Sequence, residues 1–158
     1  EEIDLCAHGK LFVKIGNEII CDENTFEITV SSTALYLMRT LEEDYNSGNY
    51  AGQLLPCCGF NFVAENKEDD FVNILGCPSE IDWAVIHRNN NVRLITEKGT
   101  EAEIDFENYK EIVLNFADKI ESFYKGSKPK LVEEQNEMNV IGYPAFWNEW
   151  NKLKSKWK

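Results

Sequence analysis

The sequence predicts an α+β fold, with an antiparallel β-meander sheet packed by three helices at about 32–45, 106–125 and 144–157. Short runs of alternating apolar and polar residues recur between residues 10 and 104, and turn-forming residues separate them. Apolar residues repeat at helical spacing in the three helical segments. Because the strands follow one another through short turns, we expect one antiparallel sheet of about five to seven strands, with the helices segregated from it.

The strands begin with a predicted hairpin, in which residues 10–15 and 18–21 flank the turn residues Gly16-Asn17. A further short strand is expected at 26–30, where large apolar and polar residues alternate. The middle of the chain predicts the rest of the meander. Its strands are expected at 54–63, 71–75, 82–87, 92–96 and 101–104, with turns at Gly76–Ser79, Arg88–Asn91 and Lys98-Gly99.

The first two helices have recognisable ends. Ser31 or Ser32 is the expected N-cap of the helix at 32–45, which runs into the three acids Glu42–Asp44. Acids at a helix C-terminus oppose the helix dipole, so this end is tolerated rather than favoured. The helix at 106–125 is the best defined, with Asp105 as its N-cap and Gly126 at its C-terminal end.

The third helix is expected to start at Pro144, because proline is favoured in the first turn of a helix. Residues 127–142 are polar with little periodicity and are expected to form a linker before this Trp-rich helix. With 158 residues, the chain is close to the size of one typical domain, so residues 1–158 are expected to form a single α+β domain.

The chain is strongly acidic, with a net charge of −12. Residues 1–124 hold 24 Asp and Glu against 9 Lys and Arg, a balance of −15, whereas the tail from residue 125 is mildly basic. Such a surface argues against nucleic acid and anionic membranes as partners, because both require clustered cations. It suits a basic protein partner, although acidity also simply keeps a protein soluble.

The cysteines indicate a reducing compartment. Five is an odd number, and the adjacent Cys57 and Cys58 do not readily pair with each other, so we expect five unbridged and mostly buried thiols. No apolar run approaches the length of a membrane span, and two Glu stand where a signal peptide would carry Lys or Arg. These features predict a cytoplasmic protein.

No catalytic or metal-binding constellation is recognisable. Zinc sites usually use Cys-x₂₋₄-Cys pairs, which are absent here, so no metal and no cofactor is expected. A cysteine nucleophile, Cys58 or Cys77 with His87 as its base, would need a lowered thiol pKa, and acidic surroundings act in the opposite direction. Phosphate-binding and hydrolase motifs are also absent. We therefore expect a protein that is not an enzyme.

Two alternatives stay open. The segment Cys57–Phe62 and His87 gather two thiols, a glycine, aromatic rings and an imidazole, which would suit a small-molecule-binding or enzymatic domain. The chain could also be a structural subunit of a larger assembly.

The candidate partner-binding residues are acids in two clusters and two tryptophans of the C-terminal helix. The first cluster is Glu42, Glu43 and Asp44, and the second is Glu65, Glu68, Asp69 and Asp70. Trp147 and Trp150 are possible aromatic anchors, because a few buried aromatic side chains often supply most of the binding energy at an interface. The same tryptophans could instead pack against the domain's own sheet, as amphipathic helices usually do.

Small size, acidity, the α+β pattern, the lack of a catalytic motif and the Trp-rich helix together resemble bacterial immunity proteins of polymorphic-toxin and contact-dependent inhibition systems. The stretch 82–124, a hairpin with strands followed by a long helix, is also loosely similar to the SMI1/KNR4-type immunity superfamily. The resemblance implies a protein that binds and neutralises a cognate basic toxin, often a nuclease, through its acidic surface.

Overall fold

The computed structural model describes residues 2–48, 53–57, 61–76 and 81–158. It has an α+β fold of three helices and antiparallel strands, as the sequence predicts. The helices are α1 (Val30–Arg39), α2 (Phe106–Gly126) and α3 (Glu137–Trp157). The strands are β1 (Val13–Ile15), β2 (Glu18–Cys21), β3 (Asn61–Val63), β4 (Asn73–Leu75), β5 (Trp83–Arg88), β6 (Asn91–Thr96) and β7 (Glu101–Asp105).

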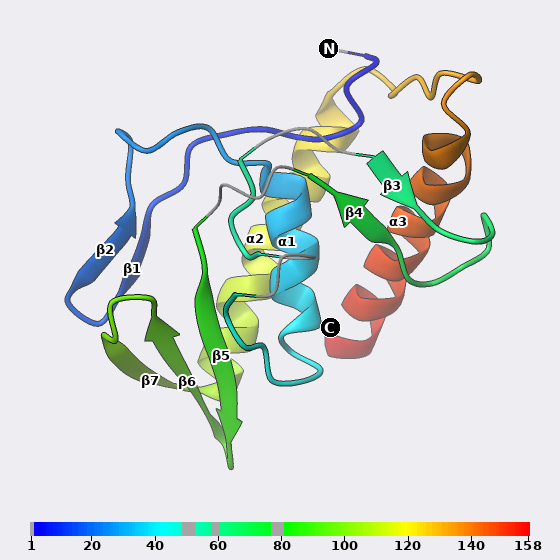
Figure 1. The fold of residues 1–158 in the computed structure, drawn as a ribbon. Coiled ribbons are helices and arrows are strands. Elements are labelled where there is room, and N and C mark those ends of the chain that lie inside the picture. Colours follow the sequence, from blue (N-terminus) through cyan, green and yellow to red (C-terminus); the bar gives the residue numbers. More distant parts are fainter. Residues whose placement is uncertain (1, 49–52, 58–60, 77–80) are drawn as a thin grey trace.

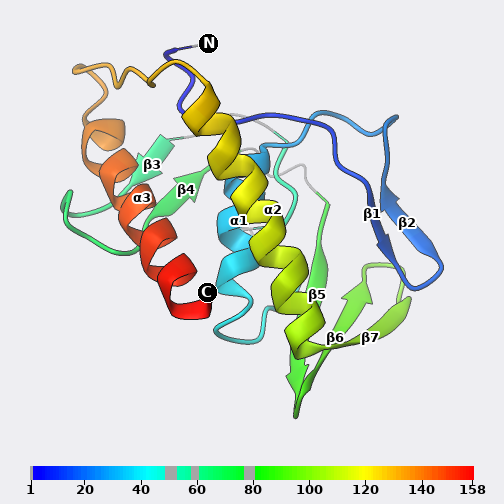
Figure 2. The ribbon, with the colours of Figure 1, turned by 180° about the vertical axis from the view of Figure 1, so that it is seen from behind.

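The described strands form three small sheets rather than the single sheet expected. β1 pairs with β2, β3 pairs with β4, and β5, β6 and β7 form a three-stranded meander. Helix α1 lies at the centre of the molecule, with the meander and the β1–β2 hairpin on one side and β3, β4 and α3 on the other (Figure 1). The view from behind shows α2 crossing α1 (Figure 2). Strand β3 packs on α3, and α1 lies between the β3–β4 hairpin and the meander (Figure 1).

The turns form at the predicted positions because their residues accept left-handed backbone conformations. Gly16 has φ +58° between β1 and β2, and Gly99 has φ +84° between β6 and β7. At the tip of the β5–β6 hairpin, Asn89 has φ +52°, a conformation that asparagine tolerates better than most residues. The Asp105 carboxylate caps α2 by accepting hydrogen bonds from the backbone N–H groups of Glu107 and Asn108.

Helix α1 is shorter than predicted at its C-terminal end and begins earlier. Its N-cap is Thr29, so Ser31 and Ser32 lie inside the first turn instead of capping it. The helix ends at Arg39, and Thr40 turns the chain so that Glu42–Asp44 lie outside the helix. This end avoids placing three carboxylates beside the negative pole of the helix dipole.

Helix α3 begins at Glu137, so Pro144 lies within it and the segment 137–142, expected to be linker, is helical. Packing against β3 explains the earlier start. The Asn139 side chain accepts a hydrogen bond from the backbone N–H of Phe62 at 2.9 Å, and Gly142 lies so close to Phe62 that no side chain fits between them. Proline has no backbone N–H, so Pro144 removes one hydrogen bond from the helix, and these contacts with β3 offset the lost stability.

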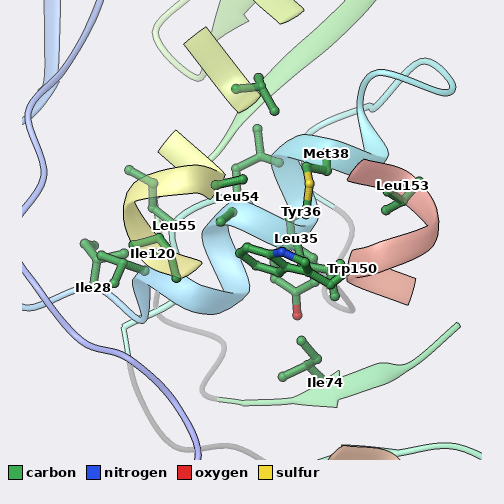
Figure 3. Close-up of a cluster of buried hydrophobic side chains, with 14 of the residues drawn as sticks. Ile28, Leu35, Tyr36, Met38, Leu54, Leu55, Ile74, Ile120, Trp150 and Leu153 are labelled. Carbon is green, nitrogen blue, oxygen red and sulfur yellow. The ribbon is translucent and has the colours of Figure 1, made fainter. Parts of the chain in front are cut away.

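The hydrophobic core joins all three helices and draws on residues from Leu5 to Leu153. Figure 3 shows the indole of Trp150, from α3, lying against Leu35 of α1. The largest fully buried side chains include Trp150, Phe62, Phe146 and Leu35. Burial of side chains of this size typically contributes about 1.5–3 kcal/mol each, so α3 is held firmly on the rest of the molecule.

Candidate functional site: an acidic face around the end of α3

The two acidic clusters predicted from the sequence lie on either side of the C-terminal part of α3. Glu42–Asp44 follow α1, and Glu65–Asp70 belong to the β3–β4 loop. Lys156 and the Trp157 indole of α3 bond to the Glu42 carboxylate, while Lys152 pairs with Asp70 at 2.7 Å. Residues of both clusters line one hollow of about 220 Å³. We call the two clusters together the acidic face.

A bidentate ion pair positions the acidic face. Arg39 Nε and Nη2 donate to the two carboxylate oxygens of Glu149 at 2.6 and 2.8 Å, and the Glu149 side chain is almost fully buried. The backbone of Val72 joins this pair, because its N–H donates to Glu149 at 2.9 Å and its carbonyl accepts from Arg39 at 2.6 Å. The start of β4 is thereby fixed to both α1 and α3.

Two members of the second cluster hold the loop in shape. Asp69 accepts hydrogen bonds from the backbone N–H groups of Asn66, at 2.9 Å, and Glu65, at 3.0 Å, and these bonds lower the pKa of its carboxyl group. Asn148 of α3 donates its side-chain amide to the carbonyls of Lys67 and Asp69. Asp69 is therefore a loop-forming residue, and Asp70 is engaged by Lys152.

Glu42 is also engaged within the molecule. Partial burial opposes ionisation of its carboxyl group, but the hydrogen bonds from Lys156 and Trp157 outweigh this effect and lower its pKa. The neighbouring Asp44 accepts a hydrogen bond from the backbone N–H of His87 at 2.7 Å. Each of these two carboxylates links the turn after α1 to another element.

The acids most available to a partner are Glu43, Glu65 and Glu68. All three are exposed, and none has an ion-pair partner within the part of the chain that the structure describes. Glu65 and Glu68 line a second, open hollow of about 660 Å³ beside the β3–β4 loop. The acidic face therefore combines carboxylates already bonded within the molecule with carboxylates free to meet cations.

Phe71 is an aromatic residue of this face that the sequence reasoning missed. It is 52% exposed, it lines both hollows, and the Arg39 guanidinium lies 4.5 Å from its ring centre. The only signal in the sequence is its position directly after Asp69-Asp70. An exposed aromatic ring stacked on a fixed guanidinium is a preorganised contact surface.

The expected aromatic anchors lie elsewhere. Trp150 is fully buried in the core of the structure, so its side chain does not lie on the surface. Trp147 is partly buried, with its ring 5.0 Å from that of Tyr124 and 5.2 Å from that of Phe146. Both tryptophans pack on the hydrophobic core from the apolar side of α3, and this packing holds the helix in place.

The alternative site, at Cys57–Phe62 and His87, has less support. Phe62 is fully buried against Tyr143 and Phe146, and residues 58–60 lie outside the described part of the chain. The Nε2 atom of His87 lies 2.8 Å from the carbonyl oxygen of Thr40. Because a carbonyl only accepts, this nitrogen must carry a proton and cannot act as a base in this arrangement.

Two of the cysteines are buried thiols with little nucleophilic character. Burial raises the pKa of Cys6 to about 12 and also raises that of Cys21. Cys57 is partly buried, whereas Cys58 and Cys77 lie outside the described residues. Across the described ranges, no three His, Cys, Asp or Glu side chains are grouped as metal ligands would be.

Helices α2 and α3 are long enough to cross a bilayer, yet neither they nor any other helix in the described part of the chain is apolar enough to do so. Comparison with protein-family models, with curated proteins and with solved structures finds no match for this chain.

Proposed function

We propose that this protein is a non-enzymatic inhibitor that binds and neutralises a basic cognate protein toxin through the acidic face. The observation that carries the proposal is the meeting of two acidic clusters, from separate parts of the sequence, around the end of α3. The ion pair between Arg39 and Glu149 and the core packing of α3 hold these acids in place. Binding would therefore require little ordering of the face, which preserves affinity.

The exposed acids and Phe71 would have different roles in binding. Glu43, Glu65 and Glu68 would attract the partner over a distance and raise its association rate, because complementary fields steer encounter. Phe71 would supply apolar contact area at the centre of the face. A Lys or Arg side chain of the partner fits the hollow beside Glu65 and Glu68, where carboxylates would replace the phosphates that a nuclease toxin binds.

The resemblance to immunity proteins points to where the partner is found, since immunity genes usually lie beside the gene of their toxin. The C-terminal domain of the protein encoded next to this chain is the first partner to test. Association would be followed by stopped-flow mixing at several salt concentrations. The double variant Glu65→Lys/Glu68→Lys should slow association about tenfold or more at low salt and flatten its salt dependence.

A matched control changes the same net charge at another place. Glu133→Lys/Glu134→Lys reverses two exposed, adjacent acids in the segment before α3, outside the acidic face. If both double variants slow association equally, overall charge decides the rate and the acidic face is not the binding surface. If the wild-type chain leaves the toxin active, the inhibitor proposal fails.

A further inference from the structure

The β3–β4 hairpin has one buried side and one exposed side. Burial alternates along both strands and along the two residues before β4, so that every second side chain is buried and the others face outward. The outward side chains of β3 lie opposite those of β4 in the register of the hairpin, and together they form one continuous surface. We call this surface the outer hairpin face, and its members are Asn61, Val63, Phe71, Asn73 and Leu75.

The outer hairpin face is apolar along much of its length. Phe71 is 52% exposed and Leu75 is 54% exposed. Val63 is half-buried on the neighbouring strand. The two large side chains stand four residues apart, about 13 Å along the chain at about 3.3 Å per residue. Exposed apolar side chains that share one face, rather than lying singly, mark interaction surfaces.

The acidic loop between β3 and β4 lies at one end of this face. The open hollow beside the loop is walled by Val63, Ala64 and Phe71 on its apolar side and carries Glu65 and Glu68 as exposed acids. A lysine or arginine side chain has a matching division, because its apolar stem packs on apolar surface while its charged head stays with carboxylates. The face therefore fits an element that is basic at the loop and apolar along β4.

The backbone of the hairpin is already bonded to other elements. The N–H of Phe62 donates to the side chain of Asn139 at 2.9 Å, which ties β3 to α3. At the start of β4, the N–H of Val72 donates to Glu149 and its carbonyl accepts from Arg39. A partner strand that extended the sheet would have to break such bonds, so a partner meets the side chains of the face instead. A helix suits this contact, because it rises 13 Å in about nine residues and gathers apolar side chains on one side.

We propose that the outer hairpin face binds an amphipathic helix of the basic partner, with a Lys or Arg side chain in the hollow beside the acidic loop and apolar side chains on Phe71 and Leu75. This partner is the basic toxin of the proposed function, on which the inference rests. The acids would then mainly raise the association rate, whereas the apolar contacts along β4 would slow dissociation.

Two synthetic helical peptides of roughly 14 residues, about four turns, test the face without a toxin. The first has leucines on one side of the helix and lysines elsewhere, and in the second alanine replaces every leucine, so both carry the same charge. Each would be titrated into the full chain with ¹³C-labelled leucine and valine methyl groups and followed by NMR, with the Leu75 signals assigned by their loss in Leu75→Ser. The leucine peptide should bind saturably, shift these signals and bind about tenfold more tightly than the alanine peptide.

A matched pair of variants separates this face from general effects of apolar surface. Ile19 is 52% exposed and lies on β2, in another two-stranded hairpin on the opposite side of α1 (Figure 1). Leu75→Ser should weaken the leucine peptide about tenfold, whereas Ile19→Ser should leave its affinity unchanged. Both side chains are exposed, so neither substitution removes a core residue. Glu65→Lys/Glu68→Lys should weaken both peptides, because both depend on the acids.

Four results would overturn the proposal: no saturable binding of the leucine peptide, equal affinity for the two peptides, binding that leaves the Leu75 signals unshifted, or equal weakening by Leu75→Ser and Ile19→Ser. Equal affinity for the two peptides would assign binding to charge alone. The toxin tests the proposed function separately. If the face binds the leucine peptide as expected but the chain leaves the toxin active, the inhibitor proposal fails and the docking surface stands. If the toxin is neutralised and the peptide results are negative, the docking surface fails alone.

Discussion

The Arg39 guanidinium and the Glu149 carboxylate form a bidentate ion pair between residues 110 positions apart in the chain. The pair joins α1 to α3, and the backbone of Val72 adds two hydrogen bonds to it. Arg39 also contacts the ring of Phe71. One buried charge pair therefore connects the core of the fold to the acidic face.

Removal of one member of this ion pair should lower the stability of the protein strongly. Glu149→Ala leaves the partly buried Arg39 without its counter-charge and the Val72 N–H without an acceptor. We expect the free energy of unfolding to fall by about 3–5 kcal/mol, as for other broken buried pairs, in urea denaturation followed by circular dichroism. Lys152→Ala breaks an exposed pair one turn further along α3 and should cost about 1 kcal/mol or less. Equal losses in the two variants would contradict the structural role of Glu149.

Gly142 should tolerate no side chain. A methyl group at this position would overlap the carbonyl of Phe62, and both residues are buried between α3 and β3. Gly142→Ala should therefore destabilise the protein by about 1–3 kcal/mol or more, measured by thermal unfolding. Gly126→Ala is the control, because no atom lies within 4 Å of the added methyl group at the end of α2. This variant should be neutral or more stable by up to about 1 kcal/mol.

Local features of the fold could be predicted from the sequence because local chemistry decides them. The turns at Gly16, Asn89 and Gly99 follow from residues that accept positive φ, and the Asp105 cap sets the start of α2. Features that depend on tertiary contacts could not be predicted from the sequence. The earlier start of α3 depends on Asn139 and Gly142 meeting β3, which no helical periodicity reveals.

The candidate site was predictable only in part. Runs of acids in the sequence locate both clusters, but only the fold brings them to the same helix end. The lysines that bind Glu42 and Asp70 are in the tail, where charge counting indicates a separate basic segment. Trp150 is buried and Phe71 is exposed, and neither could be read from the sequence, because a stripe of tryptophans does not reveal whether the helix faces the core or the solvent.

Asp82 should make stability fall as the pH rises. Burial raises the pKa of its carboxyl group in the folded protein, and hydrogen bonds from Tyr45 and the backbone N–H groups of Leu54 and Gly48 only partly offset this. The folded protein therefore keeps the proton to a higher pH than the unfolded chain, in which an Asp pKa is about 3.9. The contribution of Asp82 to stability is greatest below about pH 4 and is lost as the pH rises through the folded pKa.

The Asp82→Asn variant isolates this effect, because asparagine does not titrate. It should be less stable at every pH, since its amide cannot accept all the bonds that the carboxylate accepts. Urea unfolding of both proteins from pH 4 to pH 7 gives the difference in their free energies of unfolding. The advantage of the wild type should shrink with rising pH, and a constant or growing advantage would contradict the raised pKa.

The buried thiols should resist alkylation. With its pKa raised to about 12 by burial, Cys6 is almost entirely a protonated thiol at pH 8, and alkylating reagents react with thiolates. Cys21 is buried and its pKa is raised as well. Iodoacetamide labelling followed by peptide mass spectrometry should leave both unmodified in the native protein and label both in urea. Labelling of Cys6 at the same rate in both states would show that it is not buried.

The lysines at the end of α3 provide a test with the opposite sign to charge reversal. Lys152 neutralises Asp70 beside the hollow that the two acidic clusters share. If the acidic face steers a basic partner, Lys152→Ala should release this carboxylate, raise the association rate by a few fold at low salt and steepen its salt dependence. Lys119→Ala removes the same charge from an exposed position of α2 and should have a smaller effect. Stopped-flow association with the C-terminal domain of the protein encoded next to this chain compares the two variants. A slower rate for Lys152→Ala would mean that the lysine itself contacts the partner and that the acids do not guide the encounter.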